Sequence, residues 1–185
     1  MGQRLNIELL NNGKLLANCY WHWKGYTSKS IELTDNIIQS KLAEAEPTVE
    51  TAIRIFQSLG AGLLSGDGAV EDFKHAKELI GDEAVEGTDR NLGLIAITPE
   101  SMERIENWEE ARVQIDIATK RINFGVMYDV DINYLAAYTV ICLEYDIHDM
   151  DFATFYDFCH DLNMEKLTEF PLVYQNKDKK YYQTI

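Results

Sequence analysis

The sequence lacks the segments that mark membrane and secreted proteins. Its longest apolar run, residues 134–143, is far shorter than the roughly 20 residues that a helix needs to span a bilayer. The N-terminal residues MGQRLNIELL contain neither the apolar stretch nor the small-residue cleavage site of a signal peptide. We therefore expect a cytoplasmic protein with no membrane partner.

Cysteine is scarce, and its placement argues against a cross-linked or zinc-stabilised fold. Cys19, Cys142 and Cys159 are odd in number and lie far apart among apolar residues. A disulfide framework or a zinc site would show paired cysteines at short spacings. The pattern predicts buried free thiols.

Basic residues are also few, and this narrows the choice of partner. The chain of 185 residues has 31 acidic and 17 basic residues, a net charge of −14. The excess is concentrated in residues 99–170, which hold sixteen acids and five bases, a net of −11 against −3 for the rest. Such a field repels nucleic acid and attracts basic surfaces. We expect no direct nucleic-acid binding and a basic protein surface as partner. The alternative is that the negative charge serves only to keep the protein soluble.

What the sequence does contain is paired alternating runs that predict three hairpins. Residues 4–10 and 14–23 flank Asn-Asn-Gly, residues 113–117 and 122–128 flank a short link, and residues 171–174 and 181–184 flank Asn-Lys-Asp. Alternation of apolar and polar residues around such turns is typical of antiparallel strand pairs. A further buried strand is expected within residues 92–98.

Helical periodicity fills the remaining segments. Helices are expected over residues 27–44, from Pro47 to Gly60, from residue 70 to Gly81, from Pro99, and from Phe152 onward. The glycine-rich residues 60–68 suggest a flexible connector, and residues 134–143 fit either a helix, which we favour, or a buried strand. No linker divides the chain, so we expect a single α+β domain, residues 1–185, with a largely antiparallel sheet built from hairpins and packed with helices.

The stretch NCYWHWKGYTSKS raises the question of an aromatic site around His22. Strand alternation places Trp21 and Trp23 on the core face and His22 on the opposite face. His22 and Tyr26 then lie near a strand end, where binding sites are common. Arg90 precedes a buried strand, so these three residues form a possible pocket. The alternative for Arg90 is a simple ion pair with a nearby acid, which we favour.

Carboxylates cluster in YDVDINY and YDIHDMDF and continue into the next helix. The candidate partner-binding residues are Asp129, Asp131, Asp146, Asp149, Asp151, Asp157 and Asp161. Together with His148 they also suggest a divalent metal site, but the spacing matches no established metal-binding loop. Asp149 or Asp151 fits better as the cap of the helix that follows. We expect no metal and no cofactor.

The blocks MGQRLNIE, HWKGYT and RNLGLIAIT resemble a family of small acidic proteins encoded by phages and prophages of Firmicutes. The resemblance covers about the first half of the chain. It implies expression in an infected bacterial cytoplasm and brings no catalytic residues. Small, strongly acidic phage proteins are often inhibitors of host machinery, including defence systems, and some imitate DNA.

The sequence thus favours a non-enzymatic acidic binding protein that inhibits a host nucleic-acid-handling or defence protein. The alternative is a small hydrolase or ligand-binding protein that uses the pocket, an Asp/His metal cluster or a sandwich fold. The opening hairpin followed by helices resembles N-terminal-nucleophile amidohydrolases. However, Met1-Gly2-Gln3 offers no Cys, Ser or Thr as the nucleophile of that family. The pattern leaves the oligomeric state open.

Overall fold

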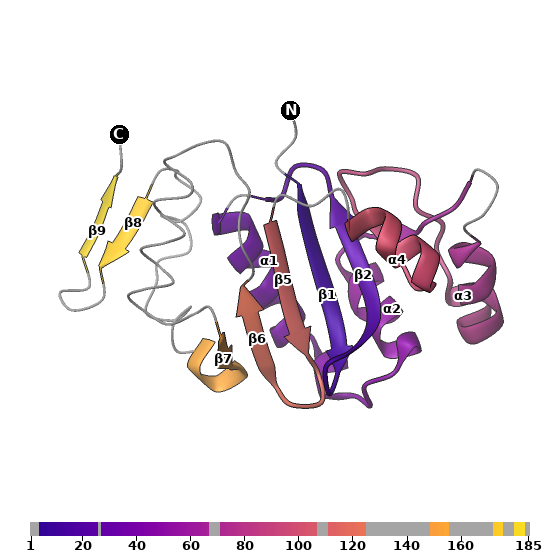
Figure 1. Cartoon of the computed structure of the whole chain (residues 1–185), viewed down its shortest axis with the longest axis horizontal. Coiled ribbons are helices and arrows are strands. Elements are labelled where there is room, and N and C mark those ends of the chain that lie inside the picture. Colours follow the sequence, from indigo (N-terminus) through magenta and orange to yellow (C-terminus); the bar gives the residue numbers. More distant parts are fainter. Residues whose placement is uncertain are drawn as a thin grey trace.

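The structure is a computed structural model and describes residues 4–25, 27–66, 71–106, 111–124, 149–155, 172–175 and 180–183. Its centre is a mixed sheet of seven strands: β1 (Leu5–Asn11), β2 (Lys14–Trp21), β3 (Gly62–Leu63), β4 (Leu94–Ala96), β5 (Ala111–Asp116), β6 (Arg121–Phe124) and β7 (Asp149–Asp151). The strand order is β3-β4-β2-β1-β5-β6-β7 (Figure 1). The expected α+β class is confirmed.

Two of the predicted hairpins form the middle of this sheet. β1 and β2 pair antiparallel around Asn12 and Gly13, whose φ angles of 50° and 80° suit the tight turn. β5 and β6 pair antiparallel around a turn that contains Lys120 at a φ of 57°. The two hairpins meet through a parallel pairing of β1 with β5, and β3 with β4 is also parallel. The sheet is therefore largely, but not wholly, antiparallel.

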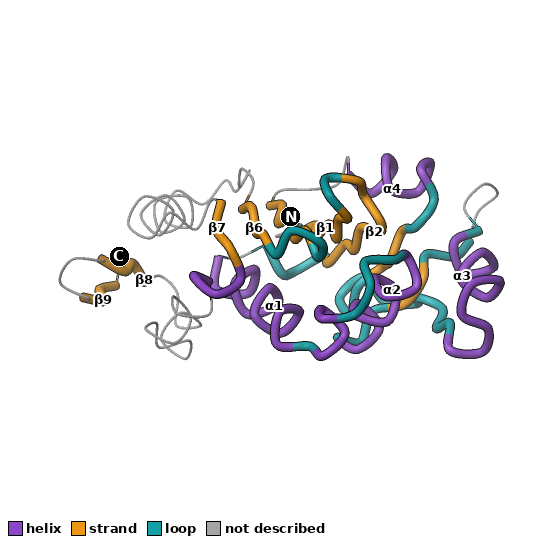
Figure 2. The backbone as a smooth tube through the Cα atoms, turned by 90° about the horizontal axis from the view of Figure 1, so that it is seen from below, coloured by secondary structure: helices purple, strands orange, loops and turns teal. Residues whose placement is uncertain are grey.

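Helices cover both faces of the sheet. The helical segments are α1 (Thr27–Gln39), η1 (Lys41–Glu44), α2 (Val49–Ser58), α3 (Asp72–Ile80), η2 (Gly81–Glu83) and α4 (Pro99–Glu106). Figure 2 shows α1 and α2 on one side of the strands and α4 on the other. α3 contacts α2 and β3 at the β3 end of the sheet.

Several predicted boundaries need correction. The first helix ends at Gln39, before a separate 3-10 turn that runs to Glu44. Pro47 lies before the helix it was expected to begin, because Thr48 is the N-cap and accepts a hydrogen bond from the Thr51 N–H. The glycine-rich connector is partly regular, since Gly62 and Leu63 form β3.

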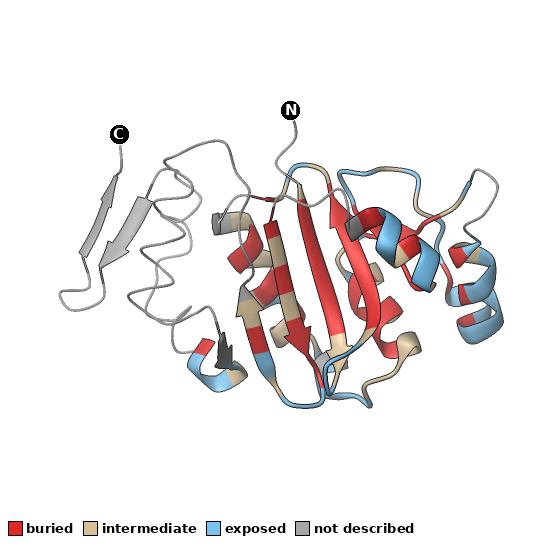
Figure 3. Ribbon diagram, in the orientation of Figure 1, coloured by how far each residue is buried: buried red, intermediate tan, exposed pale blue. Residues whose placement is uncertain are grey.

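The main core lies between the sheet and the pair α1 and α2. Leu5, Ile7 and Leu9 of β1 are fully buried there, as alternation predicts. Trp21 of β2 packs edge-on against Phe56 of α2, with ring centroids 5.9 Å apart. Figure 3 shows the continuous burial of β1 and β2 across the centre of the molecule. Burial of this apolar face supplies the main driving force for the fold.

The opposite face of the same strands is polar at its centre. The register aligns Glu8 with Asn18 on one side and with Gln114 on the other. The Gln114 amide donates to Glu8 Oε2 over 2.7 Å, and the Asn6 amide donates to the Ile105 carbonyl of α4 over 2.9 Å. This last bond ties α4 to β1. Among the described residues, an apolar patch at α4 contains Tyr20, Leu64, Leu94, Ala96 and Ile105, with Met102 packed against it.

A separate two-stranded antiparallel sheet pairs β8 (Leu172–Gln175) with β9 (Lys180–Gln183), which confirms the third predicted hairpin. Residues 134–143, where helix and strand were both considered, lie outside the described residues. Within the described ranges no helix has the length and hydropathy needed to cross a membrane.

Candidate functional site

A solvent-facing cavity opens at the β3–β4 end of the sheet. It has a volume of about 310 Å³ and is lined by Leu64, Ser65, Gly66, Gly87, Thr88, Arg90, Leu94 and Arg104. The size reaches the lower end of the range for small-molecule sites. Leu64 and Leu94 belong to the apolar patch beneath α4. The other side chains bring two guanidinium groups and two hydroxyl groups to the cavity.

Close backbone packing positions the loop that carries this cavity. The Leu63 N–H donates to the Val85 carbonyl and the Gly87 N–H donates to the Leu63 carbonyl, each over 2.7 Å. A Cβ on Gly62 would lie only 2.6 Å from the Glu86 carbonyl oxygen. A side chain at this contact would therefore force the backbone apart, so residues 85–87 approach β3 closely because Gly62 has none.

A third glycine sets the path of the chain between Arg90 and β4. Gly93 has a φ of 112°, a conformation that other residues rarely adopt, and an added Cβ would lie 2.8 Å from Trp21 Nε1. That indole N–H donates to the Leu92 carbonyl over 3.1 Å. The loop before β4 is thus fixed against the buried end of β2.

Of the three residues predicted to form a pocket, Arg90 is among the described lining residues of this cavity and His22 is not, although the backbones of the two meet. The His22 N–H donates to the Arg90 carbonyl over 3.0 Å, although 67 residues separate them in the chain. The expected ion pair of Arg90 is wrong: among the described residues no acid lies within ion-pair distance of its guanidinium. Tyr26 lies outside the described residues.

The His22 side chain sits between two aromatic groups. Its Nδ1 lies 2.8 Å from the Tyr20 hydroxyl, and its ring stands edge-on to Trp23 with centroids 5.0 Å apart. Trp23 was expected in the core, and this is wrong: the residue is 45% exposed. β2 ends at Trp21, so the alternation that holds within the strand no longer decides where Trp23 points.

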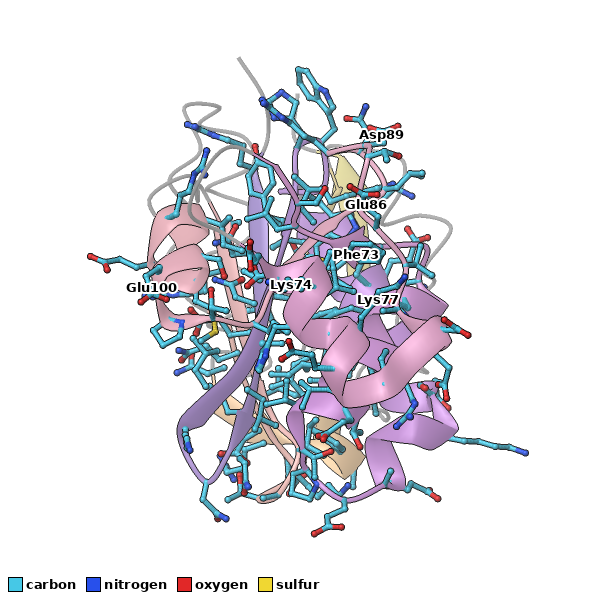
Figure 4. All side chains as sticks on the ribbon, turned by 90° about the vertical axis from the view of Figure 1, so that its right-hand side faces the viewer. Phe73, Lys74, Lys77, Glu86, Asp89 and Glu100 are labelled. Atoms are coloured by element: carbon cyan, nitrogen blue, oxygen red, sulfur yellow. The ribbon has the colours of Figure 1, made fainter. Side chains whose placement is uncertain are left out.

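Acidic groups near this loop are held by neighbours. Glu86 accepts a hydrogen bond from the Ser65 hydroxyl over 2.6 Å, and Asp89 accepts one from the Asn91 N–H over 2.8 Å. Figure 4 shows Glu86 and Asp89 near each other, apart from Glu100 on α4. None of the described residues that line the arginine-bearing cavity is acidic. The charged side chains among the described lining residues are therefore both arginines, with the Glu86 carboxylate bonded to the lining Ser65.

A larger cavity of about 490 Å³ lies between the end of α1 and the segment after β7. Glu44, Asp151, Lys120 and Phe152 are among its lining residues. The Lys120 ammonium stands over the Phe152 ring, 5.5 Å from its centroid. Because charges of both signs are mixed in this lining, it favours no one class of ligand.

Most of the acidic residues predicted to bind a partner lie outside the part of the chain that the structure describes. Asp129, Asp131, Asp146, Asp157 and Asp161 lie outside the described residues. Asp149 begins β7 at the far edge of the sheet. Asp151 is exposed, and its Oδ1 accepts from the Thr154 N–H over 2.7 Å, a bond that lowers the pKa of its carboxyl. The predicted role of Asp151 as a helix cap is confirmed.

The described residues contain neither a cluster of metal-ligating side chains nor an accessible cysteine. No group of three or more His, Cys, Asp or Glu side chains there is arranged to hold a metal ion, while Asp146 and His148 lie outside the ranges searched. Cys19 is fully buried, as predicted, and this burial raises the pKa of its thiol well above the ordinary value. Its thiol therefore stays protonated and has no contact with solvent.

Arg104, Thr88 and Ser65 are lining residues that the sequence pattern did not indicate. Arg104 lies on α4 beside the buried Ile105, where an arginine is an ordinary surface residue of an amphipathic helix. Its proximity to the loop of Arg90 depends on tertiary packing. No local pattern in the sequence predicts that Arg104 lies beside this loop.

No protein-family model, no curated protein and no solved structure matches this chain. The resemblance to small phage proteins therefore stays a prediction.

Proposed function

We propose that this chain is a non-enzymatic binding protein whose acidic half docks onto the basic surface of a host protein. The observation that carries the proposal is the division of charge. Residues 99–170 have a net charge of −11, and the rest of the chain has −3. A concentrated field of one sign steers an oppositely charged partner and suppresses contact with wrong ones.

The chemistry of such a partner follows from the charge. Extended basic surfaces are typical of proteins that bind DNA or RNA, because they neutralise phosphates with lysine and arginine. A carboxylate-rich protein that occupies such a surface excludes the nucleic acid. An inhibitor of a nucleic-acid-handling or defence protein of the infected bacterium, acting in the cytoplasm, fits this requirement.

The first half of the chain contains three lysine or arginine ion pairs among its described residues. Glu32 pairs with Lys29 over 2.6 Å, Glu83 with Arg54 over 2.9 Å, and Glu71 with Lys74 over 3.0 Å. These pairs are solvent-exposed, so each contributes little to stability, but each offsets a negative charge locally. The bases of these pairs are already counted in the net charge of −3 outside residues 99–170.

The alternative of a small hydrolase finds no nucleophile in Cys19. Its nucleophile would need an activated side chain beside a base, and the buried Cys19 thiol has neither an activated state nor access. A metal-dependent hydrolase would use Asp146 and His148, which lie outside the described residues.

The test begins with capture of partners from a bacterial lysate on the whole chain, followed by purification of each captured protein. Binding is then measured with the pure partner in the presence of increasing DNA or RNA. We expect competition, because both ligands use the basic surface. A partner that binds this chain and nucleic acid simultaneously, each with unchanged affinity, would contradict the proposal.

A further inference from the structure

The arginine-bearing cavity has a composition that is unusual for this chain. Acids outnumber bases 31 to 17 in the sequence, but the described lining residues include Arg90 and Arg104 and no acid. The two arginines come from different elements, the loop before β4 and helix α4. We infer that this cavity binds a small phosphate-like oxyanion.

The form of the lining favours a tetrahedral oxyanion over a carboxylate. A single guanidinium fork satisfies both oxygens of a planar carboxylate. Two guanidinium groups and the Thr88 hydroxyl come from separate residues and can contact several oxygens of one ion. The Ser65 hydroxyl donates to Glu86, so its proton is already used, and this bond also holds the Glu86 carboxylate.

The contacts of Arg90 are those expected of a ligand-binding residue. Its guanidinium has no acidic partner among the described residues, while its carbonyl is held by the His22 N–H. The Arg90 backbone is thus held by the residue that follows β2, which leaves its side chain for an incoming anion. Gly66 and Gly87 contribute no side chains to the cavity wall, which leaves room for a ligand beside the backbone.

The lining also limits the size and kind of ligand. Among the described lining residues there is no aromatic ring on which a nucleobase would stack. Leu64 and Leu94 supply the apolar surface. Inorganic phosphate or a small phosphate ester fits this combination, whereas a long nucleic acid is disfavoured by the net charge of −14.

The experiment titrates the whole chain with inorganic phosphate and, separately, with succinate at equal ionic strength, and follows the backbone amide resonances of Gly87 and Thr88. We expect saturable shifts with phosphate. Arg90→Gln and Arg104→Gln should each weaken phosphate binding at least tenfold. Arg54→Gln removes the same charge from an exposed ion pair elsewhere and should change binding less than twofold.

Thermal unfolding of each variant checks that the fold is retained, and Arg90→Lys provides a second variant. It keeps the charge but loses the guanidinium fork, so it should bind phosphate with intermediate affinity. Preferential binding of succinate, shifts that do not saturate with phosphate, or equal weakening by Arg54→Gln would each overturn the inference. A protein that binds phosphate but no basic partner would refute the docking function alone, so the two proposals fail separately.

Discussion

The backbone N–H of Gly13 donates to Oδ2 of Asp116 over 2.7 Å, so a carboxylate at the end of β5 closes the turn between β1 and β2. Oδ1 of the same carboxylate accepts from Asn12 at 3.2 Å, and from Ala118 and Thr119 at 3.0 Å each. Asp116 therefore joins the turns of both central hairpins. These turns lie side by side because β1 and β5 pair in parallel.

Replacement of this carboxylate should destabilise the protein in a pH-dependent way. Burial alone would raise the pKa of Asp116, but the N–H groups of Thr119, Gly13 and Asn12 bring it below the ordinary value. Asp116→Asn loses charge-assisted hydrogen bonds and should lower the free energy of unfolding by about 2 kcal/mol at neutral pH. Denaturant titration of both proteins measures this loss.

The sign of the pH effect follows from the lowered pKa. The stabilisation by Asp116 is present above the unfolded-state pKa, about 3.9 for aspartate, and is lost as pH falls through the folded-state value. The difference in free energy of unfolding between Asp116→Asn and the unmodified protein should therefore disappear at acidic pH. The exposed Asp82→Asn serves as the control and should have no effect at either pH. A gap that stays constant on acidification would show that the charge of Asp116 is unimportant.

Asp72 should behave in the opposite way. It is fully buried at the start of α3, where Oδ1 accepts from the Thr98 N–H over 3.2 Å and Oδ2 has no hydrogen-bond partner among the described residues. Burial raises the pKa of this carboxyl, and the hydrogen bonds offset the rise only in part. Its contribution to stability is therefore greatest below the unfolded-state pKa and is lost as pH rises through the folded-state value.

Asp72→Asn should accordingly leave the protein as stable at neutral pH or raise its free energy of unfolding by up to about 1 kcal/mol, since a neutral amide costs less to bury. Any gain in the free energy of unfolding of Asp72→Asn should become smaller at acidic pH, because Asp72 is then protonated in the unmodified protein. The same denaturant titrations measure it, with Asp116→Asn as the contrasting variant. A loss above about 1 kcal/mol at neutral pH would mean that the ionised carboxylate itself is needed.

The two neighbouring tryptophans give a direct test of the end of β2. Trp21 is 1% exposed and Trp23 is 45% exposed. Trp21→Ala should cost roughly 3–5 kcal/mol because it leaves a large cavity against Phe56. Trp23→Ala should change the free energy of unfolding by less than about 0.5 kcal/mol. Similar losses from both substitutions, measured by chemical denaturation, would place Trp23 back in the core.

The strands of this fold could be predicted because their signal is local. Alternation with a period of two and an Asn-Gly turn both act within a few residues, so β1 and β2 follow directly from the sequence. The parallel pairing of β1 with β5 has no such signal, because it joins segments separated by about a hundred residues. The same pattern misplaced Trp23, since alternation does not mark the residue at which a strand ends.

The candidate site shows the same division between local and tertiary information. His22 and Arg90 could be singled out as residues near strand ends. Arg104 could not, because its position beside the loop of Arg90 depends on how α4 packs over β2 and β4. The absence of an acidic partner for Arg90 among the described residues is also a tertiary property, which counting nearby acids in the sequence predicted wrongly.

The docking proposal predicts a specific dependence on salt and on the position of the charges. Association with the purified partner should slow as salt rises, because the screening length falls to about 10 Å near 0.1 M. Replacement of Asp146, Asp157 and Asp161 by Asn should lower the association rate several-fold and change the dissociation rate less, since steering acts before contact. Stopped-flow or surface-based kinetics at several salt concentrations separate the two rates.

The control for this comparison removes the same number of charges from the other part of the chain. Glu44, Glu46 and Asp82 are exposed. Glu83 and Glu86 are unsuitable, because Glu83 pairs with Arg54 and Glu86 bonds to Ser65. Neutralisation of the three control acids should change the association rate less than about twofold, even though the net charge changes equally. If both triple variants slow association alike, or if salt has no effect, the concentration of acids in residues 99–170 does not steer the partner, and the docking proposal loses its physical basis.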